Sequence, residues 1–174
     1  MDRCERQHRH IQSFGGSRGR CGLNGGILAA TYKGVLGIDF GTSTTILAKS
    51  DGTAVSTIPL DRSQMWLPSV VGRSSERWLV GEEAENLPFD HVVRSVKNSI
   101  TNNEDVVADG DLAGVSTDEV VEAILARVAL MAERNGVDVE DSLVRMGCPA
   151  FWVGSQRMRL ANLSQRAGLP VEVD

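Results

Sequence analysis

The sequence lacks any long apolar run and contains few cysteines. No stretch approaches the 18 apolar residues that a membrane-spanning helix needs, and the polar first residues carry no apolar core of a secretory signal. The three cysteines (Cys4, Cys21 and Cys148) are an odd number without C-x-x-C spacing. These absences favour a reduced, cytoplasmic protein over a membrane protein, a disulfide framework or a zinc site.

Basic residues are scarce over most of the chain. Residues 1–33 hold six basic and two acidic side chains, whereas residues 34–174 hold twelve and twenty-one, which gives a net charge of −5. The acidic body argues against nucleic acid as the main partner, because phosphate contacts need clustered Lys and Arg. The 174 residues, 41% of them apolar, suffice for one domain with a core.

The first 33 residues are rich in glycine and arginine and show no sustained periodicity. Such a composition buries too little apolar area to offset the entropy of ordering. We therefore expect a disordered basic arm at residues 1–33. A start codon assigned too far upstream would give the same composition, and a basic arm that touches nucleic acid or a membrane is a further alternative.

From position 34 onward the pattern predicts a mixed α/β domain. Strands are expected at 35–40, 44–49 and 53–59, and the Asp51-Gly52 turn makes the three an antiparallel meander. The remaining predictions are strands at 67–71, 78–80, 142–148 and from 169, a turn at 72–77, a short helix at 81–85, an undecided segment at 92–100 and a polar loop at 101–115.

The clearest helix signal begins at Ser116. Ser116 and Glu119 match a capping box, in which each side chain satisfies a main-chain N–H of the other residue. Apolar residues then recur at helical spacing until Gly136 supplies the stop. A second helix is predicted at 155–167, ending at Gly168.

The most informative segment is Gly37–Thr45, which reads G-I-D-F-G-T-S-T-T. An apolar strand leads into Asp39, Gly41 and four consecutive hydroxyl side chains before the strand pattern resumes at Ile46. We expect a hairpin whose tip presents main-chain N–H groups, hydroxyls and one carboxylate to the same small volume. Gly41 allows a positive φ and leaves the turn open to an anion, and Asp39 would hold a hydrated divalent cation. An ordinary hairpin with β-favouring threonines is the alternative.

Further segments follow this hairpin in a recognisable order. They are L-P-S-V-V at 67–71 with L-V-G at 79–81, and C-P-A-F-W at 148–152 with S-Q-R at 155–157 and A-G-L at 167–169. Together with the hairpin they resemble the nucleotide-binding domain of the DnaK-like heat-shock chaperones, the heat-shock protein 70 family. The hairpin alone is similar to the first phosphate loop of the wider actin, sugar-kinase and chaperone ATPase superfamily. The segment from position 148 is similar to the chaperone branch.

The resemblance covers about residues 34–173 and implies a fold and cofactors. The implied fold is an α/β, actin-like ATPase (ribonuclease H-like) fold, first lobe only, with a mixed sheet and flanking helices. ATP and Mg²⁺ are the implied cofactors. In the family's complete form, ATP hydrolysis is coupled to the binding and folding of unfolded polypeptide with the help of co-chaperones, as part of the stress response. No nucleic-acid or membrane partner is implied.

The resemblance also implies a role for the residues of the hairpin. Asp39 would lie near the magnesium ion and hold it through water. Gly41, Thr42, Ser43 and Thr44 would contact the phosphates through main-chain N–H groups and hydroxyls.

Three residues outside the hairpin receive roles in the same way. Lys97 would be the catalytic residue that contacts the γ-phosphate and the attacking water, where the transition state needs fixed positive charge. Pro149 and Arg157 would relay the nucleotide state to a substrate domain. From the residues alone, Lys97 reads as a surface lysine, Pro149 as a strand terminator and Arg157 as a helix-face arginine. The residues after Lys97 and the Cys148 that replaces a valine depart from the family pattern.

The sequence shows no second D-x-G-G-G-T loop, no G-G-x-x adenosine motif and no second magnesium-directing aspartate. We therefore expect residues 34–174 to be the truncated N-terminal lobe of a chaperone-like ATPase, which alone neither binds ATP tightly nor hydrolyses it. A non-catalytic regulatory or scaffold protein with an actin-like fold is one alternative. A small-molecule kinase relative is another, which the segment at 149–168 disfavours.

Overall fold

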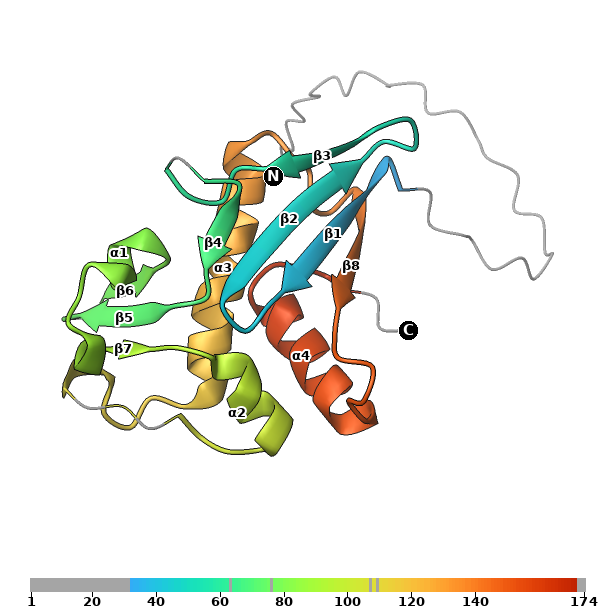
Figure 1. The fold of residues 1–174 in the computed structure, drawn as a ribbon. Helices are drawn as coiled ribbons and strands as arrows, with labels where there is room; N and C mark the ends of the chain where they lie inside the picture. The colour runs from blue at the N-terminus through green and yellow to red at the C-terminus, as the bar shows by residue number, and fades with distance from the viewer. Residues whose placement is uncertain (1–31, 63, 76, 107, 109, 172–174) are drawn as a thin grey trace, which may run out of the picture. The chain divides into compact units, whose positions relative to one another are not determined.

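The computed structural model of the chain describes residues 32–171, apart from positions 63, 76, 107 and 109. The basic segment predicted at residues 1–33 lies outside the described residues except for its last two. The described chain forms two sheets with helices packed against them (Figure 1). Among the helices of this part, none is long and apolar enough to cross a membrane.

Sheet A is a mixed sheet built around the hairpin of β1 (Gly34–Phe40) and β2 (Thr44–Ser50) (Figure 1). β2 pairs antiparallel with β3 (Val55–Ile58) towards one end and with β4 (Trp66–Pro68) towards the other. On its other side, β1 pairs in parallel with β8 (Ser142–Gly147). The predicted meander and the strand predicted at 142–148 are therefore confirmed, and the mixed α/β class with them.

Sheet B is a small antiparallel sheet in the order β6-β5-β7. Its strands are β5 (Val71–Ser74), β6 (Arg77–Val80) and β7 (Val92–Val93). The short helix α1 (Glu82–Glu85) follows β6, as predicted, and the 3₁₀ turn η1 (Phe89–His91) leads into β7.

The strand predicted at 67–71 is wrong, because the structure divides it between the two sheets. β4 ends at Pro68 in sheet A, and β5 begins at Val71 in sheet B. Between them, the N–H of Ser69 donates to the carbonyl oxygen of Ser43, so the chain leaves the strand to contact the hairpin. The turn predicted at 72–77 is also shorter than expected, since β5 continues to Ser74.

Both predicted long helices are confirmed, as α3 (Thr117–Arg134) and α4 (Gly154–Arg166). The capping box of α3 is present: Glu119 N–H donates to Ser116 Oγ at 3.3 Å, and Ser116 N–H donates to Glu119 Oε2 at 2.9 Å. Gly136, with φ of 71°, takes the left-handed conformation that ends α3.

The segments between these elements correct two expectations. The undecided residues 92–100 contain β7 and the start of α2 (Val96–Asn102). The polar loop predicted at 101–115 begins inside α2 and includes the 3₁₀ turn η2 (Gly110–Leu112), whose leucine is buried. The apolar residues of this stretch are too widely spaced to show a helical pattern, so the sequence did not predict the end of α2 or the turn η2.

α3 and α4 serve as crossover helices between parallel strands. α3 precedes β8, which lies parallel to β1, and α4 precedes Val171, which bridges in parallel to Val144 of β8. Parallel neighbours need such a crossover, because the chain must return to the same end of the sheet. The strand expected from 169 is thus represented by this bridge within the described residues.

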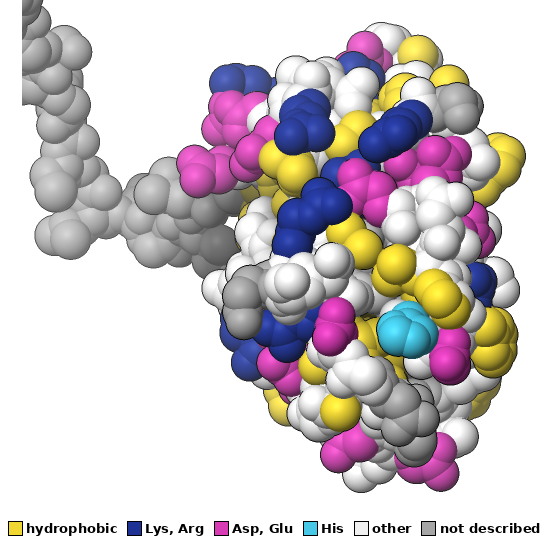
Figure 2. Space-filling view, turned by 90° about the vertical axis from the view of Figure 1, so that its left-hand side faces the viewer, with side chains coloured by type: hydrophobic (Ala, Val, Ile, Leu, Met, Phe, Trp, Pro, Cys, Tyr) yellow, Lys and Arg dark blue, Asp and Glu magenta, His cyan; other side chains and the backbone are white. Residues whose placement is uncertain are grey.

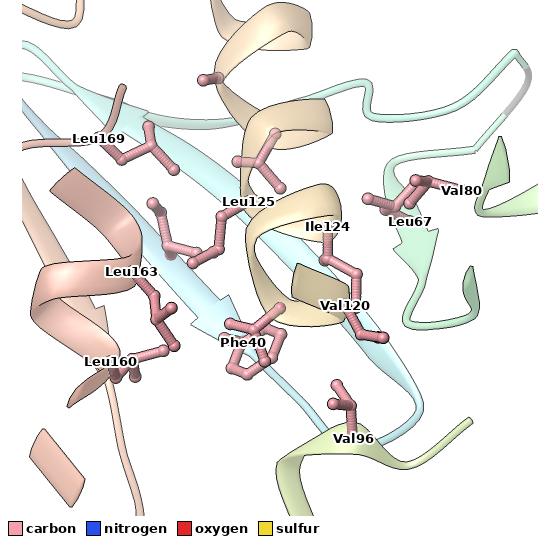
Figure 3. Close-up of a cluster of buried hydrophobic side chains, with 14 of the residues drawn as sticks. Phe40, Leu67, Val80, Val96, Val120, Ile124, Leu125, Leu160, Leu163 and Leu169 are labelled. Carbon is pink, nitrogen blue, oxygen red and sulfur yellow. The ribbon is translucent and has the colours of Figure 1, made fainter. Parts of the chain in front are cut away.

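The core lies between sheet A and these two helices (Figure 3). β1 places Leu36, Ile38 and Phe40 in it at alternate positions, while Asp39 between them is exposed. Each large side chain that is fully buried contributes about 1.5–3 kcal/mol. The helices and β4 supply the facing residues Leu67, Val120, Val121, Ile124, Leu125, Val128, Leu160 and Leu163.

A buried aspartate ties sheet B to the core. Asp61 is 3% exposed, and its Oδ2 accepts the N–H of Glu82 at the start of α1, at 2.9 Å. Its Oδ1 lies 3.7 Å from Nη2 of Arg127 on α3. A carboxylate removed from water needs such partners. These contacts fix sheet B, and with it the segment between β7 and α2, relative to the hairpin.

Candidate functional site

The tip of the β1–β2 hairpin is a tight turn closed by Gly41, whose N–H donates to the carbonyl oxygen of Thr44 at 3.0 Å. A Cβ atom at Gly41 would lie 2.3 Å from that oxygen, far inside van der Waals contact. Gly41 is not among the residues with positive φ. The sequence argument for a left-handed glycine is therefore wrong: glycine is required here because the main chain of Thr44 approaches too closely for a side chain.

Ser69 holds the hairpin tip in place from the loop between the two sheets. Its hydroxyl donates to the carbonyl oxygen of Gly41 at 3.0 Å and lies 3.0 Å from Oγ1 of Thr45. Its N–H donates to the carbonyl oxygen of Ser43 at 2.8 Å. Ser69 and Thr45 are 1% and 0% exposed, so water does not compete for these bonds. The sequence reading included Ser69 in the L-P-S-V-V stretch without assigning it a role.

Thr42, Ser43 and Thr44 line a cavity of about 360 Å³. Ser69, Arg94 and Ser95 lie on its other sides. No hydrogen bond from the three hydroxyls to another described residue is found, whereas the neighbouring Thr45 and Ser69 hydroxyls bond each other. The three hydroxyls are therefore available to a ligand.

Asp39 lines a different cavity, of about 840 Å³, together with Gly37, Arg145, Cys148 and Arg157. The two cavities share no lining residue. The sequence predicts one volume for the carboxylate and the hydroxyls. In the structure, Asp39 and the three hydroxyl residues line separate cavities.

Lys97 reaches the hairpin from α2. Its ammonium group donates to the carbonyl oxygen of Phe40 at 2.6 Å, next to Gly41. It also lies 6.0 Å from the ring centres of Phe40 and Trp152, within reach of a cation–π attraction. The structure thus places Lys97 against the hairpin rather than out in solvent, although it lines neither cavity.

A chain of hydrogen bonds continues from Lys97 to the segment that contains Pro149. The hydroxyl of Thr101 donates to the carbonyl oxygen of Lys97 at 2.9 Å and accepts the indole N–H of Trp152 at 3.0 Å. The side-chain amide of Gln156 donates to the carbonyl oxygen of Thr101 at 2.8 Å. The role of Thr101 was missed, because a helical threonine carries no signal of so distant a partner.

Arg157 and Pro149 meet at the same turn. Nε of Arg157 donates to the carbonyl oxygen of Trp152 at 3.1 Å, and Nη2 donates to that of Ala150 at 3.5 Å. The N–H of Trp152 donates to the carbonyl oxygen of Pro149 at 3.0 Å. The hairpin, Lys97, Thr101, Trp152 and Arg157 are therefore connected through successive contacts.

Comparison with known proteins finds similarity to the same chaperone family that the sequence motifs resemble. The chain is 28% identical over 142 residues to the chaperone protein DnaK from each of two strains of Halobacterium salinarum. The match covers 79% of this chain and 22% of each relative, so the chain spans about a fifth of their length. No family model matches the sequence. The similarity indicates a distant, heat-shock protein 70-like relationship.

Proposed function

We propose that residues 34–174 form the first lobe of an actin-like ATPase domain in a chaperone-like protein, and that the β1–β2 hairpin binds the phosphates of ATP. The observation that carries this proposal is the hairpin tip. Buried Ser69 holds it, and its residues Thr42, Ser43 and Thr44, whose hydroxyls have no described hydrogen-bond partner, line a cavity. The order of strands and crossover helices is compatible with such a lobe, and the similarity to DnaK supports the chaperone branch.

The residues around the tip fit a magnesium-bound polyphosphate. Thr42, Ser43 and Thr44 can donate hydroxyl hydrogen bonds to phosphoryl oxygens. Asp39 is an exposed, single carboxylate. No group of three or more His, Cys, Asp or Glu side chains that could hold a metal occurs in the described part of the chain. A lone carboxylate suits Mg²⁺, which keeps several waters and takes further oxygens from phosphates.

Lys97 is proposed as the catalytic cation in this scheme. Its ammonium group already contacts the main chain of Phe40, one residue before Gly41. Positive charge at this place would stabilise the charge that spreads over the γ-phosphoryl oxygens in the transition state. Pro149 and Arg157, joined to Lys97 through Thr101 and Trp152, are proposed to transmit the state of this site.

In the whole protein we propose that ATP hydrolysis is coupled to the binding of unfolded polypeptide, assisted by co-chaperones, in the cytoplasm. The 174 residues by themselves are expected to bind MgATP weakly, because the sequence contains a single phosphate-loop motif.

The test is a titration of the 174-residue chain with MgATP, followed by the main-chain amide signals in ¹H–¹⁵N spectra. We expect the signals of residues 41–45 to shift with millimolar affinity, and the double variant T42A/T44A to weaken the effect. T57A, which removes an exposed hydroxyl on β3, serves as the matched control. Hairpin signals that stay unmoved at saturating MgATP would contradict the proposal. Low-micromolar affinity would contradict the expected weakness.

A further inference from the structure

Arg94 lines the same cavity as the hydroxyl-bearing residues of the hairpin. This cavity of about 360 Å³ is lined by Thr42, Ser43 and Thr44 from the hairpin and by Arg94 and Ser95 from the segment between β7 and α2. Lys97, only three residues further along, does not line it. Among the described lining residues, Arg94 is the one that carries positive charge.

The main-chain conformation of Ser95 explains why Arg94 and Lys97, three positions apart, contact different parts of the structure. Ser95 has φ of 56° and ψ of 30°, a left-handed conformation that costs a residue other than glycine about 1 kcal/mol or more. This conformation turns the chain sharply between β7 and α2. It leaves Arg94 at the cavity, while Val96 enters the core and Lys97 reaches Phe40.

The present partners of Arg94 hold it only loosely. Its Nη1 lies 3.8 Å from Oε1 of Glu85, and its guanidinium lies 5.9 Å from the ring centre of Phe89. The side chains of Arg94 and Glu85 are 38% and 44% exposed. Ion pairs of this length and exposure contribute little to stability, because water competes for both charges.

Among the described residues, no other basic side chain lines this cavity. On the face seen in Figure 2, basic and acidic side chains are interspersed. Arg62 and Arg77 both pair with Glu83, at 3.9 and 3.4 Å, and neither lines the cavity. Arg94 combines a comparable ion pair with a place in the lining of the cavity that Thr42, Ser43 and Thr44 also line.

We propose that Arg94 binds a phosphoryl group of a polyphosphate ligand in the cavity that Thr42–Thr44 also line, and that Glu85 competes with the ligand for its guanidinium. The inference rests on the proposed function, since it names a further residue of the same phosphate site. A planar guanidinium donates two parallel hydrogen bonds to phosphoryl oxygens, which an ammonium group does not. Glu85 lines the same cavity, so its carboxylate both pairs with Arg94 and repels an anionic ligand.

The test uses the full chain and two probes, MgATP and tripolyphosphate, with dissociation constants measured from the amide shifts of residues 42–44. R94Q is expected to weaken binding of both probes about tenfold, because a charge-assisted contact is lost. R94K is expected to show an intermediate loss, since lysine keeps the charge without the fork. E85Q is expected to strengthen binding about threefold, because the competitor loses its charge. R77Q, which also removes an arginine paired with a glutamate on sheet B, is the matched control and should bind as wild type.

The outcomes separate this inference from the proposed function. If MgATP shifts the hairpin signals with equal affinity in the wild type and R94Q, the role of Arg94 is wrong and the proposed function stands. If tripolyphosphate binds in an Arg94-dependent way and MgATP does not bind, the anion site stands and the nucleotide function is wrong. If neither probe binds the wild type, both are wrong. Weaker binding by E85Q would overturn the competition with Glu85.

Discussion

The cavity beside Asp39 and the cavity beside Thr42–Thr44 are both lined by residues of one hairpin, yet they differ in size and lining. The first has a volume of about 840 Å³, and glycines, apolar side chains, Arg145 and Arg157 line it. The second has a volume of about 360 Å³ and is lined by hydroxyls and the Arg94–Glu85 pair. Residues that are close neighbours in sequence therefore meet quite different chemistry.

This difference shows how a short strand divides its functional groups. Asp39 belongs to the exposed face of β1, and its neighbours Ile38 and Phe40 belong to the core. Of the hydroxyl residues, Thr42 and Ser43 lie between the two strands and Thr44 is the first residue of β2. Under the proposed function, a magnesium ion near Asp39 and phosphates near the hydroxyls would have to contact each other beside Gly41. The tip of the hairpin is therefore the place where substitutions should have the largest effects.

The largest effect is expected from G41A, which should distort the turn at the tip of the β1–β2 hairpin. The added Cβ atom would lie 2.3 Å from the main-chain oxygen of Thr44, so the turn has to open. We expect the free energy of unfolding, measured by urea denaturation, to fall by about 2–3 kcal/mol. G37A, on the adjoining strand β1, is the control, because its Cβ would meet nothing within 4 Å. Equal losses in the two variants would show that close packing at the tip is not the cause.

The next effect is expected from S69A, which removes the hydroxyl that holds the tip. The carbonyl oxygen of Gly41 and the buried hydroxyl of Thr45 would each lose a partner, at a cost of about 2 kcal/mol in unfolding free energy. S43A removes an exposed hydroxyl from the same hairpin and should change stability by less than about 0.5 kcal/mol. Adding T45V to S69A should recover part of the loss, because one unsatisfied group disappears. A double variant that is less stable than S69A would contradict this account.

A smaller effect is expected from T101V, which cuts the connection between Lys97 and Trp152. The partly buried contacts of the Thr101 hydroxyl with the carbonyl oxygen of Lys97 and the indole N–H of Trp152 would be lost. Stability should fall by about 1 kcal/mol, and the indole N–H signal of Trp152 should move in the ¹H–¹⁵N spectrum. T57V, on the exposed surface of β3, should leave that signal in place. An unmoved indole signal in T101V would remove Thr101 from the proposed path.

Features that depend on neighbours in sequence were predictable. The alternation of β1, the Asp51-Gly52 turn and the capping box of Ser116 and Glu119 each involve residues a few positions apart. Their physical causes, which are strand geometry, turn conformation and unsatisfied N–H groups, act within that distance. These features predicted the meander and α3.

Contacts between distant residues were not predictable from the pattern. Ser69 and Gly41 are 28 positions apart, and Trp152 and Thr101 are 51 apart. Arg94 reaches the hydroxyl cavity only because sheet B is fixed against the core by Asp61 and because Ser95 adopts a left-handed conformation. Gly41 could be identified as necessary, but the steric reason required the position of the Thr44 oxygen.

The smallest effect is expected at the capping box of α3, which touches neither cavity and so isolates stability from ligand binding. The main-chain N–H and the hydroxyl of Ser116 donate to the carboxylate of Glu119 and hold its pKa below the usual value. A lowered pKa in the folded state stabilises the fold above about pH 4.3, the usual value of a free glutamate, and this contribution is lost as the pH falls through the folded-state pKa. E119Q should therefore be about 0.5 kcal/mol less stable than wild type at neutral pH, and this difference in stability should disappear in acid.

The affinity of E119Q for tripolyphosphate should equal that of wild type, whereas G41A and S69A should lose both stability and affinity. Reduced affinity in E119Q would mean that general loss of stability, and not the geometry of the hairpin tip, governs binding at the hydroxyl cavity.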